Sequence, residues 1–243
     1  PMVRTATLNA LETVSASVRV QLAWPLLGDP VRAVRIEAAR ILAGIPTGAL
    51  GEAQLAQLDR ALAEYVDSQL AMAERPEAQV NLGNYYAARG AADSAINAYE
   101  TALGLDSGFV PAYANLADLY RRSNDEAAAE EVLRRAIKIS SGSADLHHAL
   151  GLSLIRQQRL PDGVAELQLA AKLSPENPRY VYVYAVALNS TGKPQQAIMV
   201  LQGAHNAHPN DRDILSALVA FNRDAGNDRQ AARYAEKLQA LSP

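Results

Sequence analysis

A spacing of 34 residues recurs through the last two thirds of the chain, and it constrains the fold more than any other feature. One column of this repeat holds large side chains, Leu82, Leu116, Leu150, Tyr184 and Leu218. The next column holds smaller ones, Gly83, Ala117, Gly151, Ala185 and Val219, and a third holds only Ala or Gly, at Ala95, Ala129, Gly163, Ala197 and Ala231. A gapless repeat of this length predicts a solenoid, in which each unit packs only on its neighbours.

Each repeat is predicted to be two helices joined by a tight turn. The turns fall near Gly90, Asn124, Gln158, Gly192 and Gly226. Small columns mark places where two helix backbones approach closely, and large residues fill the adjoining holes. The five units are therefore expected at residues 76–109, 110–143, 144–177, 178–211 and 212–243.

This pattern of small and large positions resembles the tetratricopeptide-repeat (TPR) family across residues 76–243. The resemblance implies an all-α fold, a right-handed α-solenoid superhelix of helix-turn-helix repeats. It also implies a non-enzymatic scaffold that binds a protein or peptide in the concave groove.

Residues 179–186 test the repeat register, because their alternating Tyr and Val residues favour a strand locally. The register instead places them on the first helix of the fourth unit, and Pro194 at the start of the second helix, where a missing N–H costs little. We expect the register to override the local propensity.

The first 75 residues follow a different pattern. Val3 and Arg4 recur 31 residues later as Val34 and Arg35, shortly after Asp29. This arrangement resembles one and a half HEAT repeats over residues 1–48, a family in which such Asp and Arg residues form a ladder between units. Residues 49–75 are predicted to form a junction helix, and further helical repeats are expected upstream of Pro1.

HEAT-like units that run into TPR units also resemble the C-terminal part of some bacterial multihaem c-type cytochrome-like proteins. The chain has no Cys, and therefore no haem-attachment motif of its own. Haem motifs would lie upstream, so no cofactor is expected here. This resemblance would imply a periplasmic location; without it, a cytoplasmic one is expected.

Composition argues against several other functions. A net charge of −3 argues against a nucleic-acid surface, and no apolar run is long enough to span a bilayer. His205 and His208 lack a third ligand nearby, so no metal site is expected. No catalytic residue is assigned, because no acid–base pair lies in a context that suggests a cleft.

The TPR resemblance places the binding residues on the first helix of each unit. The candidate groove residues are Asn81, Asn84, Asn115, Asp118, Arg121, Arg122, His148, Leu152, Arg156, Tyr182 and Asn189, and Arg179 and Asp213 occupy further groove positions. Asn amides can bond a peptide backbone, and Arg can hold a carboxylate through two hydrogen bonds. Arg122 and Arg156 occupy the same position in adjacent units, which predicts an extended, acidic partner segment.

Two alternatives remain open from the sequence. These groove residues could be solvated helix faces, with both Arg residues paired to local acids. The chain would then be a structural arm that positions an upstream catalytic or redox domain. Self-association is also expected through the C-terminal end, where Val219, Leu238 and Leu241 lack a covering helix.

Overall fold

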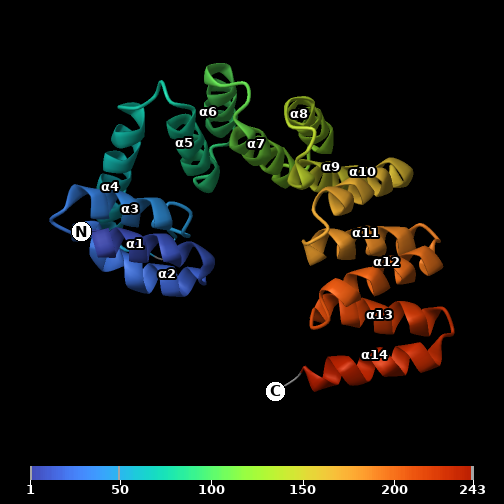
Figure 1. Cartoon of the computed structure of the whole chain (residues 1–243). Helices are drawn as coiled ribbons and strands as arrows, with labels where there is room; N and C mark the ends of the chain where they lie inside the picture. The colour runs from blue at the N-terminus through green and yellow to red at the C-terminus, as the bar shows by residue number, and fades with distance from the viewer. Residues whose placement is uncertain (1, 49, 242–243) are drawn as a thin grey trace. The chain divides into compact units, whose positions relative to one another are not determined.

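The computed structural model describes residues 2–48 and 50–241, and every regular element in these residues is helical (Figure 1). The α-helices are α1 (Met2–Ala10), α2 (Ala16–Ala23), α3 (Arg32–Leu42), α4 (Glu52–Leu70), α5 (Pro76–Ala88), α6 (Ala92–Leu105), α7 (Val110–Arg122), α8 (Glu126–Ile139), α9 (Ala144–Arg156), α10 (Leu160–Leu173), α11 (Pro178–Ser190), α12 (Pro194–Ala207), α13 (Arg212–Asp224) and α14 (Asp228–Ala240). Two short 3-10 helices are η1 (Leu11–Thr13) and η2 (Trp24–Gly28). The predicted all-α solenoid of paired helices is confirmed.

Packing divides the chain into two compact units, residues 1–119 and 120–243. The first contains α1 to α6 and most of α7, and the second contains α8 to α14. The residues predicted to start each repeat, from Pro76 to Arg212, are the first residues of α5, α7, α9, α11 and α13.

In the first unit, one apolar core joins α1, α3 and α4. Leu8, Val34, Leu42 and Leu58 are completely buried in it. Arg4 and Asp29 form an ion pair, with Arg4 Nε 2.9 Å from Asp29 Oδ2. A hydrogen bond from the Val31 amide, together with the Arg4 guanidinium, holds the pKa of Asp29 below its usual value.

The first repeat, α5 packed on α6, shows why one column is small. A Cβ added to Gly83 would lie 2.3 Å from Cε1 of Tyr99, so only Gly lets the Tyr99 ring lie against α5. This Tyr99 is 1% exposed. The small residue at Gly83 is therefore required by the large Tyr99 side chain that packs against it.

In the second unit, α9 and α10 approach closely at two facing glycines. A Cβ on Gly163 would lie 2.9 Å from the carbonyl oxygen of Gly151, and one on Gly151 would lie 3.0 Å from that of Gly163. Further along, the core of α11 to α14 is built on Leu188, Leu201 and Ile214. The predicted close approach at the Gly/Ala columns is confirmed at these glycines.

The predicted turns are confirmed as well. Gly90, Gly192 and Gly226 have φ of 76°, 78° and 74°, and Asn124 and Gln158 take φ of 61° and 63° at the equivalent positions. This left-handed backbone conformation ends the first helix of a repeat, and its conformational free energy is least unfavourable for glycine. The strand-like residues 179–186 lie within α11, and α12 begins at Pro194, as the register predicts.

Candidate functional site

The candidate groove residues all lie on the first helices of the repeats, and their exposure falls into three classes. The exposed ones are Asn84, Asp118, Arg121, Arg122 and Arg156; the half-buried ones are Asn81, Asn115, Leu152, Tyr182 and Asn189; His148 is buried. Most of these residues are therefore accessible to a partner. The contacts that each residue already makes determine which hydrogen-bonding or charged groups remain available.

In the first unit, the three asparagines are held by neighbouring side chains. Asn84 Oδ1 accepts hydrogen bonds from the Tyr99 hydroxyl at 2.8 Å and from Asn115 Nδ2 at 2.9 Å. Asn81 Nδ2 donates to Gln69 Oε1 at 2.9 Å. These bonds fix the orientation of the Asn84 amide, whose nitrogen is left as a donor, and they occupy part of the capacity of Asn115.

In the second unit, Arg156 is paired within the protein. Both oxygens of Glu126, on α8, accept hydrogen bonds from this guanidinium, and Ser153 also donates to Glu126 at 2.7 Å. The Arg156 contact holds the pKa of Glu126 below its usual value. Arg156 is therefore paired with an acid, as one of the alternatives left open by the sequence has it, and Arg121 and Arg122 are not free either.

His148 was expected to face the groove, but its side chain is buried. It is 8% exposed, because its ring packs against Tyr180 at 4.8 Å between ring centroids. Neither ring nitrogen has a hydrogen-bond partner among the described residues. Burial, with a smaller contribution from Arg179, lowers the pKa of His148. The residue therefore acts as a neutral packing group.

His148 makes stability depend on pH. Because its pKa is lowered in the folded chain, its contribution to stability is complete above the unfolded pKa of about 6.5 and is lost as pH falls from there toward the folded pKa. His148→Phe keeps the ring contact and should reduce the loss of stability between pH 7.5 and pH 5, as followed by urea unfolding. His205 is also buried and its pKa is also lowered, so part of the dependence of the unfolding free energy on pH should remain in this variant. If the unfolding free energy of His148→Phe depends on pH as strongly as that of the wild type, His148 does not cause this pH dependence.

A cavity of about 470 Å³ lies between α11 and the start of α13. It is lined by Pro178, Arg179, Tyr182, Val183, Asp211 and Asp213. Tyr182 belongs to the candidate set, and Arg179 and Asp213 lie at the further groove positions. Sequence reasoning missed Pro178, Val183 and Asp211, although all three lie within five residues of the start of a predicted first helix.

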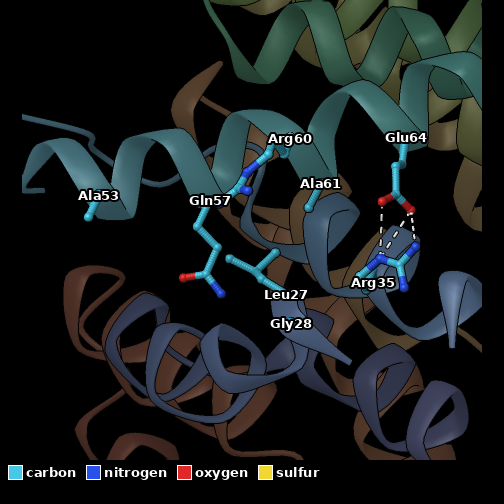
Figure 2. Close-up of a pocket in the computed structure, with 8 residues that line it drawn as sticks. All are labelled: Leu27, Gly28, Arg35, Ala53, Gln57, Arg60, Ala61 and Glu64. Atoms are coloured by element: carbon cyan, nitrogen blue, oxygen red, sulfur yellow. Dashed lines mark hydrogen bonds and ion pairs between the residues drawn. The ribbon is translucent and has the colours of Figure 1, made fainter. Parts of the chain in front are cut away.

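The first unit holds two further cavities. One, of about 370 Å³, lies between η2 and α4, where Gln57 extends toward Leu27 and Gly28 (Figure 2). On its other side Arg35 Nη2 lies 2.8 Å from Glu64 Oε2, so these two charges neutralise each other (Figure 2). The other, of about 210 Å³, includes the candidate residues Asn81 and Asn84.

Comparison with known families decides the nature of the repeats. Two tetratricopeptide repeat models match residues 86–151 and 148–212. The chain is a tetratricopeptide-repeat protein. Such folds are typically non-enzymatic scaffolds for protein interactions. No described helix has the length and apolarity needed to cross a membrane. Over the same described residues, no three His, Cys, Asp or Glu side chains gather as a metal site.

A curated relative of this TPR protein is the E3 ubiquitin-protein ligase CHIP of Arabidopsis thaliana, 38% identical over 81 residues. That alignment covers 33% of this chain and 29% of the relative, so the chain spans less than a third of the length of the relative it matches.

Solved structures with the same fold include MamA, with a TM-score of 0.59 at 20% identity over 68% of this chain and 91% of that one. YrrB, described as a TPR protein with an unusual peptide-binding site, gives 0.56 at 19% identity over 70% and 88%. PilF of Pseudomonas aeruginosa gives 0.58 at 21% identity over 73% and 78%. At these identities the likeness shows the fold alone.

Proposed function

We propose that this TPR protein is a non-enzymatic scaffold that binds an extended protein segment along the first helices of its repeats. The observation that carries the proposal is the cavity beside Tyr182, whose lining comes from the first helices of two consecutive repeats. Its volume, about 470 Å³, is within the range of about 300–1,000 Å³ typical of ligand sites.

The chemistry of this cavity suits a mixed segment. Tyr182 and Val183 offer apolar contact, whereas Arg179 and Asp213 are exposed and carry opposite charges. An extended peptide needs both kinds of contact, because apolar anchors supply most of the affinity and polar groups set the register. The solved TPR structure described as having a peptide-binding site supports the same class of partner.

The test is peptide binding by the wild type and by Tyr182→Ala. Twelve-residue peptides selected from a random display library on the wild type should bind Tyr182→Ala at least about tenfold more weakly, because an aromatic anchor is typically worth about 1.4 kcal/mol or more. Arg179→Ala changes only an exposed side chain and should also weaken binding.

Met199→Ala is the matched control, because Met199 is 70% exposed on the second helix α12 and is not part of the cavity. Equal affinities for all four proteins, with folding intact by circular dichroism, would exclude the cavity as the binding site. The chain would then fit the alternative, a structural arm for an upstream catalytic or redox domain.

We also propose that residues 1–48 are HEAT-like. The Arg4–Asp29 ion pair joins the two segments that carry the repeated Val-Arg pattern, as the ladder of that family would require. Arg35, the second Arg of the pattern, instead pairs with Glu64 of α4 and donates to the Asp29 carbonyl at 2.8 Å. The multihaem parentage rests on the resemblance alone.

A further inference from the structure

The cavity of about 210 Å³ in the first unit joins the N-terminal helices to the first repeat. The side chains that matter for its chemistry are Arg19 from α2, Arg40 from α3, Tyr65 from α4, and Asn81, Asn84 and Tyr85 from α5. Half of this wall therefore lies outside the repeats. We call it the junction pocket.

Arg19 lines the junction pocket, and one of its donors is unsatisfied. Its Nε is buried and has no hydrogen-bond partner within the described part of the chain. A buried guanidinium N–H without an acceptor is costly, because the group has lost its water. The second guanidinium, that of Arg40, is already engaged: its Nε donates to Glu37 Oε1 at 2.9 Å. Of the two guanidinium groups of the pocket, Arg19 is therefore the one whose Nε has no acceptor among the described residues.

The charge of the junction pocket defines that acceptor. Two guanidinium groups and no carboxylate line it, and the nearby Glu37 is paired with Arg40. The Asn84 amide adds a donor, because Tyr99 and Asn115 occupy its oxygen. Guanidinium and amide N–H groups together favour a carboxylate, which accepts several hydrogen bonds at once.

The size and walls of the junction pocket define what carries the carboxylate. Its volume lies below the roughly 300 Å³ at which small-molecule sites begin, so it has room for about one side chain. The rings of Tyr65 and Tyr85, with centroids 6.1 Å apart, provide an apolar surface for the methylene groups of such a side chain.

We propose that the junction pocket binds the carboxylate of an Asp or Glu side chain carried by a partner segment that lies on α5, the first helix of the first repeat. This inference rests on the proposed function for the source of that side chain. It assigns the recognition of an acidic partner to Arg19, outside the repeats, in place of Arg156, which Glu126 already occupies.

The first experiment observes the wild-type pocket directly. Arginine Nε–Hε signals are recorded by NMR while N-acetyl-glutamate N-methylamide is added, with the glutamine analogue as the neutral comparison. The Arg19 signal, identified by its loss in Arg19→Gln, should shift saturably with the glutamate compound alone. Arg60 is the internal control, because its Nε already donates to the Ala56 carbonyl at 3.1 Å. No saturable shift at Arg19 would overturn the proposal.

The second experiment uses the library-selected peptides. One group of them should share an acidic residue at one position. Changing that residue to its amide should weaken binding about tenfold to the wild type but less than twofold to Arg19→Gln. Arg60→Gln should behave as the wild type. A library that yields peptides dependent on Tyr182 but none coupled to Arg19 would overturn this inference and leave the proposed function standing. If no peptide binds the wild type, the proposed function fails, and the NMR titration alone decides whether the pocket holds a carboxylate.

Discussion

Gly163→Ala should lower the free energy of unfolding by about 1–3 kcal/mol, the cost of overpacking a close-packed contact. The new methyl group would lie 2.8 Å from Ile155 Cδ1 and 2.9 Å from the carbonyl oxygen of Gly151. The Ile155 side chain can rotate away, but the backbone of α9 can relieve the second contact only by moving away from α10. The loss of this approach should outweigh the gain in helix propensity of about 1 kcal/mol that Ala brings.

Gly203→Ala is the matched control for this substitution. Gly203 also lies inside the second helix of a repeat, but nothing lies within 4 Å of the position its Cβ would take. The same change should therefore stabilise the protein by about 0.5–1 kcal/mol. Urea unfolding of both variants measures the two values. Stabilisation by both substitutions would show that α9 and α10 tolerate a wider separation than the structure has.

The repeat columns predicted the fold because each column reports one packing requirement five times. Asn124 and Gln158 would not be recognised as left-handed turn residues by themselves, yet their alignment with Gly90, Gly192 and Gly226 places them correctly. The same register identified α11 as a helix despite its Tyr and Val content. In a solenoid, the packing of neighbouring units overrides local propensity.

The candidate site was predicted less well, because its chemistry depends on contacts between unlike positions. Glu126 and Arg156 lie 30 residues apart, on a second helix and the following first helix, so no single column contains their ion pair. His148 is covered by Tyr180, a residue of the next repeat. The junction pocket lies between helices of two different patterns, and a repeat register says nothing about such a place.

The largest effect is expected from Leu201→Ala, which should destabilise its surroundings by about 2–5 kcal/mol. Leu201 is completely buried in the core shared by α11 to α14, so the substitution removes apolar contacts and leaves a cavity. In a solenoid, energetic coupling passes mainly between neighbouring repeats. The loss should therefore be concentrated in α11 to α13, with α1 to α4 keeping their stability.

Hydrogen exchange followed by mass spectrometry can resolve this pattern peptide by peptide. Amides of α11, α12 and α13 should exchange faster in Leu201→Ala, whereas those of α3 and α4, which pack around Leu58 in a separate core, should exchange at the wild-type rate. The conservative variant Leu201→Met, which nearly keeps the volume, should cost less than about 1.5 kcal/mol and leave the pattern intact. Equal acceleration from α3 to α13 would mean that the chain unfolds as one cooperative block, and the stacked repeats would not be energetically separable.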